Sequence, residues 1–107
     1  MQLVLNKTAY PPGSSAIVTI ENGLGVKITV TDHHTDCTYV QLEHFVGGWQ
    51  LVAPCRRQIA TRLVNLAPGS ATPQTIGIPT GPGAAGTYQV VLTYNNTLVV
   101  SPTFTVG

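Results

Sequence analysis

The chain has 107 residues, a net charge of +1 and only 8% charged residues, far below the quarter that is usual in soluble proteins. This length suits one domain with one core, so we expect a single domain over residues 1–107. The near-neutral charge argues against a nucleic acid or an anionic membrane as partner, and no apolar run is long enough to form a membrane-spanning helix.

The first part of the chain predicts short strands separated by turns. Residues 3–6 are expected to form a strand and not a signal peptide, which favours a domain taken from a longer exported protein and an extracytoplasmic location. Residues 15–21 alternate between apolar and polar side chains, with Ala16, Val18 and Ile20 directed inward.

Residues 38–53 predict a hairpin, because Gly47-Gly48 is a two-residue turn signal. With that register, Val46 lies opposite Trp49, and Trp49 and Leu51 belong to the core. Tyr39 and Phe45 are then expected on the solvent face of the same hairpin.

Residues 86–94 form the clearest strand of the sequence, with large side chains at alternate positions. Tyr88, after a turn rich in glycine and proline, is expected to be a structural tyrosine corner, whose hydroxyl binds the preceding loop. The next strand is expected to follow a three-residue turn with a bulge, which places Leu92 opposite Val100 and Tyr88 opposite Phe104.

No segment has a helical period, so the sequence predicts an all-β protein of seven to eight antiparallel strands and no helix. The expected inner residues are large or small apolar side chains at alternate strand positions, namely Ala16, Val18, Ile20, Ile28, Leu42, Trp49, Leu51, Tyr88, Val90, Leu92 and Phe104.

The two cysteines, Cys37 and Cys55, suit one disulfide, worth roughly 3 kcal/mol by loop-closure entropy. The alternative is two free thiols in a reducing compartment. The hairpin register sets Cys55 opposite Val40, so a bridge requires the chain to leave the ladder at Pro54.

The order of these signals resembles the bacterial immunoglobulin-like domains of secreted and cell-envelope proteins. The residues that carry the resemblance are Tyr10-Pro11-Pro12-Gly13, Val18-Thr19-Ile20-Glu21-Asn22, Trp49, Leu66-Ala67-Pro68-Gly69-Ser70, Gly86-Thr87-Tyr88-Gln89-Val90 and Phe104-Thr105-Val106. The resemblance implies an immunoglobulin-like Greek-key β-sandwich and a noncatalytic role as a module or spacer. Val90 stands where antibody domains carry a core cysteine, so any disulfide here is peripheral.

No catalytic, metal or cofactor site is expected. His33 and His34, with Asp36 and Cys37 nearby, lack the spacing of strong metal-binding motifs. The four carboxylates lie in segments predicted to face solvent, which gives no acid–base pair.

The candidate contact surface consists of two ring-bearing residues for sugar contact and three arginines for an anion or acidic glycan, namely Tyr39, Phe45, Arg56, Arg57 and Arg62. We therefore expect a noncatalytic module of an exported bacterial protein, monomeric as an isolated domain, that serves as a spacer or contacts an unknown protein or glycan. The alternatives are a protein-binding or protease-inhibitor-like domain that presents loops such as 46–49, and a small metal-handling domain.

Overall fold

The computed structural model describes residues 1–32, 37–52 and 62–107 of the chain. Within them lie eleven strands and no α-helix. The strands are β1 (Gln2–Leu5), β2 (Ala9–Tyr10), β3 (Ser15–Glu21), β4 (Ile28–Thr31), β5 (Gln41–Phe45), β6 (Trp49–Leu51), β7 (Leu63–Leu66), β8 (Ala71–Gly77), β9 (Gly86–Tyr94), β10 (Thr97–Val100) and β11 (Phe104–Val106).

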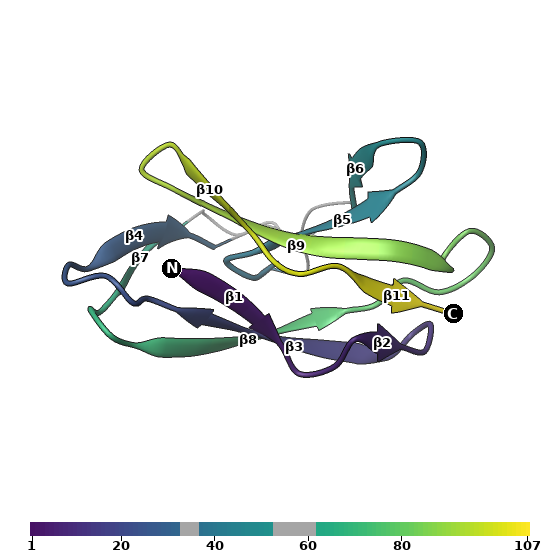
Figure 1. The fold of residues 1–107 in the computed structure, drawn as a ribbon, viewed down its shortest axis with the longest axis horizontal. Helices are drawn as coiled ribbons and strands as arrows, with labels where there is room; N and C mark the ends of the chain where they lie inside the picture. The colour runs from purple at the N-terminus through teal and green to yellow at the C-terminus, as the bar shows by residue number, and fades with distance from the viewer. Residues whose placement is uncertain (33–36, 53–61) are drawn as a thin grey trace.

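The strands face each other in two layers, as in a β-sandwich (Figure 1). One layer has the order β1-β3-β8, and the other has the order β2-β11-β9-β5-β6, with β10 also paired to β9. The strands β4 and β7 form a two-stranded ribbon. The expected all-β class is confirmed, but eleven strands are described in place of seven or eight. The pairing of β2 with β11 is parallel, so the expectation of purely antiparallel strands is wrong.

A break after β10 explains part of the larger strand number. Val100 pairs with Val91, and Phe104 pairs with Tyr88. The chain therefore advances four residues from Val100 to Phe104 along a stretch that β9 covers in three. At this bulge the Val90 N–H donates to the side-chain Oγ of Ser101 at 2.9 Å, and the next residue, Pro102, has no N–H to donate. One ribbon thereby becomes two strands.

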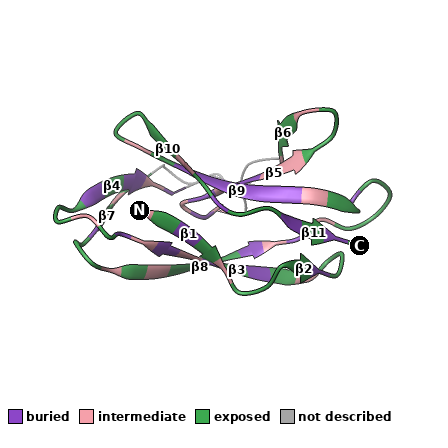
Figure 2. Cartoon of the chain, viewed as in Figure 1, coloured by how far each residue is buried: buried purple, intermediate pink, exposed green. Residues whose placement is uncertain are grey.

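The core lies between the two layers, where the purple segments of the facing strands meet (Figure 2). Nine of the eleven expected inner residues are buried, and the largest of them, Tyr88 and Phe104, lie opposite each other on β9 and β11. Trp49 and Leu51 are exposed, so their assignment to the core is wrong.

The β5–β6 hairpin has a different register from the predicted one. Phe45, and not Val46, pairs with Trp49, so the turn has three residues and contains Gly47 at a positive φ of 67°. A slip of one residue moves every following side chain to the other face of a strand, which is why Trp49 and Leu51 leave the core.

The β9–β10 hairpin also differs from the prediction, in the opposite sense. Its turn has two residues, Asn95 and Asn96, both at positive φ, as a type I′ turn requires. Leu92 therefore pairs with Val99 and not with Val100. The bulge comes after β10 and restores the predicted pairing of Tyr88 with Phe104.

Candidate interaction surface

One side of the β10-β9-β5-β6 sheet faces away from the core, and its residues follow from the strand registers. Side chains of directly paired residues share a face, and every second residue of a strand lies on it. Starting from the β9 residues that alternate with the inward Tyr88, Val90 and Leu92, this side of the sheet carries Gln41 and Thr87 and nine further residues: Gln89, Val91, Thr93, Leu98, Val100, Glu43, Phe45, Trp49 and Leu51. These nine residues are called the outer face below.

The outer face is unusually apolar for a solvent side of a sheet. Five of its side chains are large, hydrophobic and exposed: Leu98 by 61%, Leu51 by 51%, Phe45 by 50%, Val100 by 47% and Trp49 by 39%. They make up half of the ten exposed large hydrophobic residues in the described part of the chain. A gathering of this kind on one face marks an interaction site more often than scattered single residues do.

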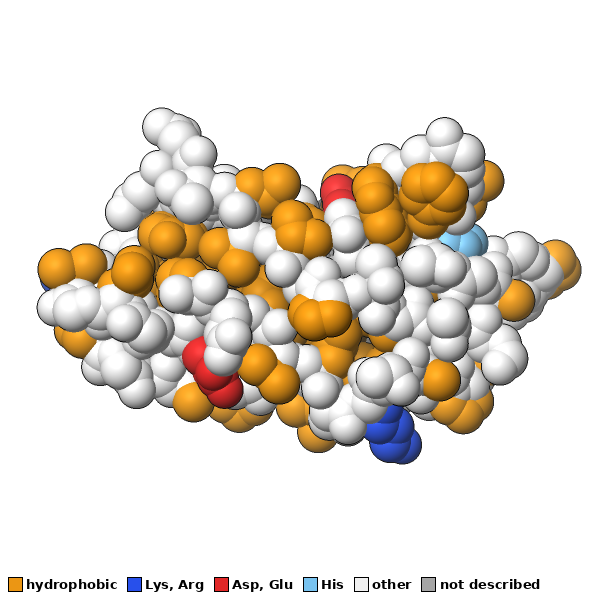
Figure 3. Space-filling view, in the orientation of Figure 1, with side chains coloured by type: hydrophobic (Ala, Val, Ile, Leu, Met, Phe, Trp, Pro, Cys, Tyr) orange, Lys and Arg blue, Asp and Glu red, His pale blue; other side chains and the backbone are white. Residues whose placement is uncertain are grey.

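The outer face is hollow, because a hairpin rises at each side of it. Figure 3 shows the β9–β10 hairpin and the β5–β6 hairpin projecting on either side of a depression over β9, with hydrophobic side chains along it. Val91 lies in the floor between Val100 and Gln41, its paired neighbours on β10 and β5, and it is buried although it points away from the core.

A polar pair crosses the outer face from β9 to β5. The side-chain amide Nε2 of Gln89 donates to Oε1 of Glu43 at 2.7 Å, and Gln89 is itself buried. Leu51 pairs with Glu43 on the other side. Glu43 is the one charged residue among the nine, and it lies between a buried amide and an exposed aliphatic side chain.

Two aromatic rings stand at the β5–β6 end of the outer face. The ring centroids of Phe45 and Trp49 are 5.2 Å apart with an interplanar angle of 68°, which is the favourable edge-to-face arrangement. Both side chains keep much of their surface in solvent. The pair therefore offers a preformed aromatic wall next to Glu43.

Comparisons with known proteins identify no family. No family model and no curated protein matches the chain. Among solved structures it is similar to Spo0M, a sporulation control protein from Bacillus subtilis, with a TM-score of 0.49 and 16% identity. The match covers 98% of this chain and 47% of that one, so this chain spans about half the length of the Spo0M structure.

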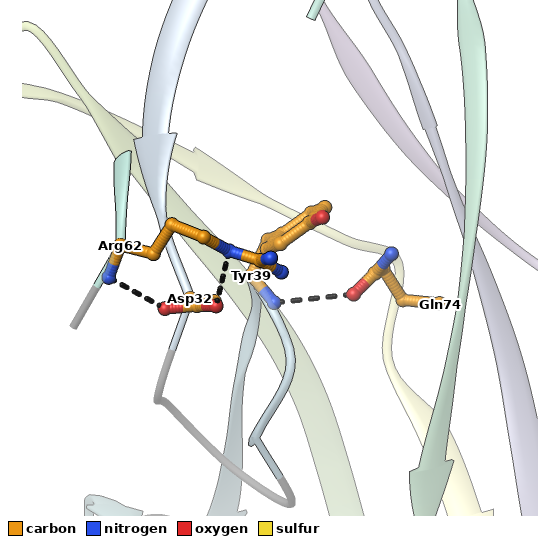
Figure 4. A network of polar contacts seen from close by, with 4 residues as sticks. All are labelled: Asp32, Tyr39, Arg62 and Gln74. Carbon is orange, nitrogen blue, oxygen red and sulfur yellow. Dashed lines mark hydrogen bonds and ion pairs between the residues drawn. The ribbon is translucent and has the colours of Figure 1, made fainter. Parts of the chain in front are cut away.

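The predicted contact residues do not form one surface. Phe45 belongs to the outer face, whereas Tyr39 is partly buried against the core and its backbone N–H donates to Oε1 of Gln74 at 3.2 Å (Figure 4). Arg62 lies next to β7, which Figure 1 places toward the other end of the molecule from the β5–β6 turn. Arg56 and Arg57 lie outside the described residues.

Arg62 ties two strand ends together. Its backbone N–H and its Nε donate to the two carboxylate oxygens of Asp32, at 2.9 Å and 3.1 Å (Figure 4). The Asp32 side chain is 9% exposed and that of Arg62 71% exposed, so the carboxylate is the inner partner. This contact joins the chain after β4 to the chain before β7 and gives Arg62 a structural role.

The predicted disulfide and the metal alternative both involve residues outside the described part. Cys37 is described, at a positive φ of 60°, but Cys55 is not, so the pairing of the two cysteines stays a prediction. His33, His34 and Asp36 are likewise outside it. In the parts of the chain that are described, no three histidine, cysteine or acidic residues come together as metal ligands.

Tyr88 occupies a buried corner behind the outer face. Its hydroxyl donates to the carbonyl oxygen of Ala84 at 2.6 Å, four residues upstream in the preceding loop, as is expected of a tyrosine corner. Burial raises the pKa of the Tyr88 phenol above its ordinary value. The residue fixes the start of β9, from which the outer face extends.

A second depression lies between the edges of the two layers. It is a groove of about 580 Å³ lined by residues 1–5, 7, 8 and 99–103, where β1 approaches β10.

No helix in the described ranges has the length and apolar character to cross a membrane.

The sequence prediction missed most of the outer face because it misassigned two turns. The expected two-residue turn at Gly47-Gly48 places Trp49 and Leu51 inside, and the expected three-residue turn at 95–97 places Val100 opposite the inward Leu92. The Asn95-Asn96 pair was the available signal, since two consecutive residues that tolerate positive φ favour a two-residue turn.

Proposed function

We propose that the chain is a noncatalytic immunoglobulin-like module of an exported bacterial protein, and that it contacts another protein through the outer face. The observation that carries the proposal is the group of five exposed hydrophobic side chains on one hollow sheet face. Interfaces of soluble proteins have such an apolar centre with aromatic anchors inside a polar rim.

The immunoglobulin-like topology is supported by the order of the strands. In an immunoglobulin-like chain one sheet is built from the last strand, the strand before the final ribbon and two middle strands. The order β11-β9-β5-β6 fits that sheet, with β10 and β11 together as the final ribbon, and β3 beside β8 fits the facing sheet. The bond from Tyr88 to Ala84 has the position expected for that fold. The exported bacterial context rests on the sequence resemblance and on the two cysteines.

A protein partner suits the outer face better than a glycan or no partner. Leu98, Val100 and Leu51 are aliphatic, and burial of such side chains contributes roughly 25 cal/mol per Å² removed from water. A sugar needs several hydrogen-bonding groups, and in this face they are concentrated at Glu43 and Gln89. A module that serves only as a spacer gives no reason to keep five such side chains in water.

One alternative is contact through a loop, as in protein-binding or inhibitor-like domains. Val46 is the large hydrophobic residue of the turn between Phe45 and Trp49 and is 53% exposed, so this tip could insert into a partner by itself. In that case Val46 carries the contact, and Leu98 on the distant hairpin does not.

The proposal is tested by photo-crosslinking in the bacterium that encodes the chain. A benzoylphenylalanine is placed at Leu98, at Leu51, at Val46 or, as a control, at Ile17, which is also an exposed aliphatic residue but lies on β3 in the other layer. We expect one protein to be cross-linked from both Leu98 and Leu51 and not from Ile17. Cross-links from Val46 alone would favour the loop alternative, and equal labelling from Ile17 would remove the proposal.

A further inference from the structure

We propose that the outer face receives an arginine side chain of the protein partner, with the guanidinium group between the carboxylate of Glu43 and the rings of Phe45 and Trp49. This inference rests on the proposed function, because it specifies the chemistry of the partner at the same surface. Three observations carry it: the state of the Glu43 carboxylate, the rings beside it and the charge of the surrounding residues.

Glu43 is held in place and has a free acceptor. Gln89, buried in the sheet, donates to Oε1, while Oε2 has no hydrogen-bond partner among the described residues. A partly buried carboxylate on an apolar face loses hydration when a partner covers it, and a hydrogen-bonding cation replaces that hydration more strongly than a neutral donor does. The pair from Gln89 to Glu43 thus presents one negative charge in a fixed position.

The two aromatic rings lie between Glu43 and the turn that joins β5 to β6. Phe45 is two residues further along β5 and on the same face, and Trp49 pairs with Phe45. Same-face neighbours of this kind have Cβ atoms roughly 5–8 Å apart, which is the span of an arginine head group that contacts both a carboxylate and a ring. The planar guanidinium stacks on aromatic rings and binds carboxylates through two N–H groups, whereas the ammonium group of lysine is compact and strongly hydrated.

Among the nine described residues of the outer face, Glu43 has no cation beside it. None of the other eight residues is charged, so the face carries one net negative charge with apolar surroundings. If a second copy of the chain docked face to face, its outer face would bring another Glu43 and no cation. Two carboxylates would then face each other, and like charges in an interface are unfavourable. A partner with one arginine flanked by apolar residues complements both the charge of Glu43 and the hydrophobic side chains of Leu51, Leu98 and Val100.

The test uses Trp49, the sole tryptophan of the chain, as a reporter inside the site. The full chain is titrated with the peptide acetyl-Gly-Leu-Arg-Leu-Gly-amide and with the same peptide carrying citrulline, which is neutral and nearly isosteric, or lysine. We expect saturable changes in tryptophan fluorescence and a Kd about tenfold lower for arginine than for citrulline, equal to ~1.4 kcal/mol. The lysine peptide is expected to bind less tightly than the arginine peptide.

Two variants separate the carboxylate from the rings. Glu43→Gln is expected to bring the arginine and citrulline peptides to the same Kd, and Phe45→Leu, at an exposed position, is expected to reduce the preference several-fold. Glu21→Gln, on β3 in the other layer, is the charge-matched control and should leave the preference unchanged. Thermal unfolding of each variant verifies that it is folded.

Two results overturn the inference. Equal affinity for arginine and citrulline in the wild type removes the guanidinium contact, and an unchanged preference in Glu43→Gln removes the carboxylate. If either occurs while Leu98 and Leu51 still cross-link to one partner in cells, the arginine inference fails and the proposed interaction face stands. Cross-links from those two positions to another copy of the chain, together with dimer formation in sedimentation, would instead identify a second copy as the occupant.

Discussion

The imidazole ring of His44 lies parallel to the phenol ring of Tyr88, with ring centroids 4.1 Å apart and an interplanar angle of 3°. The two residues pair across β5 and β9. Two positions before Tyr88, Gly86 passes beneath the imidazole so closely that a Cβ there would lie 2.7 Å from Nε2 of His44. Glycine at 86 therefore permits the stack that connects the hairpin of the outer face to the core.

Gly86→Ala is expected to destabilise the fold by about 2 kcal/mol, because it combines a steric overlap with a φ of 146° that side chains rarely adopt. The measurement is the midpoint of urea unfolding. Gly48→Ala is the control, since an added Cβ meets nothing within 4 Å there and φ is not positive. An equal effect at the two positions would contradict the role of His44 in excluding a side chain at 86.

Tyr88→Phe is expected to cost about 1 kcal/mol, with a larger loss if water cannot reach the Ala84 carbonyl. The substitution keeps the ring that packs on His44 and Phe104 but deletes the hydroxyl that donates to Ala84. Tyr94→Phe is the matched control, because Tyr94 is less buried and its hydroxyl has no partner in the described structure. Chemical unfolding of both variants checks the difference.

Alkaline pH is expected to weaken the fold through two buried phenols. Burial raises the pKa values of Tyr10 and Tyr88 above the ordinary value of 10.0, although the Lys7 N–H that donates to the Tyr10 hydroxyl opposes part of the rise. Raised folded pKa values mean that the folded state binds more protons, so this stability is complete below about pH 10 and is lost as pH rises through the folded values.

Urea midpoints measured between about pH 8 and about pH 11 test this dependence. Tyr88→Phe should have a shallower fall than the wild type over that interval, since one of the two shifted groups is gone. Every other titratable side chain is the same in the two proteins, so the comparison isolates the Tyr88 hydroxyl. Parallel curves would show that deprotonation of Tyr88 is not linked to unfolding.

Asn22 is expected to be among the least replaceable polar residues of the chain. Its side chain is buried, its Nδ2 donates to the carbonyls of Val26, Leu66 and Ala67, and its Oδ1 accepts from the N–H of Leu24. It thereby joins the end of β3 to the β4–β7 ribbon. Asn22→Ala leaves several buried backbone groups unpaired, and we expect a loss of roughly 3 kcal/mol.

Asn22→Asp sharpens this test because it keeps the shape of the side chain and replaces the donor with a carboxylate oxygen. We expect it to be at least as destabilising as alanine at neutral pH and to recover partly in acid, where a protonated carboxyl can donate again. Asn65→Asp is the control, on the exposed face of β7. Equal effects at 22 and 65 would contradict the importance of the buried network.

The strands were largely predictable because their periodicity is local information. Residues 15–21 and 86–94 have the predicted bounds, and Ala16, Val18, Tyr88 and Val90 point inward as their alternation requires. The pairing of Tyr88 with Phe104 was predicted from a wrong turn length. An extra residue at 101–103 compensates for the shorter turn at 95–96. No local sequence pattern predicts both the shorter turn and the bulge.

The outer face was not predictable to the same extent because it depends on turn geometry. A strand pattern leaves open which side faces the core when both sides carry apolar residues, as in the segment from Phe45 to Leu51. Three turn residues in place of two then reverse the assignment of Trp49. Glu43 and Gln89 are far apart in sequence, so their contact follows only from the pairing of β5 with β9.

The placement of Trp49 separates the two registers in solution. If it lies on the outer face, as described, Trp49→Ser and Leu51→Ser should each change the unfolding free energy by less than about 1 kcal/mol, whereas Leu42→Ala, at a buried β5 position, should cost about 3 kcal/mol. The native tryptophan emission should also respond readily to acrylamide. A large loss of stability at Trp49 combined with a quencher-resistant emission would support the two-residue turn and remove the aromatic wall beside Glu43. If Trp49 belongs to an exposed interaction surface, the two serine variants should keep the stability of the wild type and acrylamide should quench the tryptophan fluorescence readily.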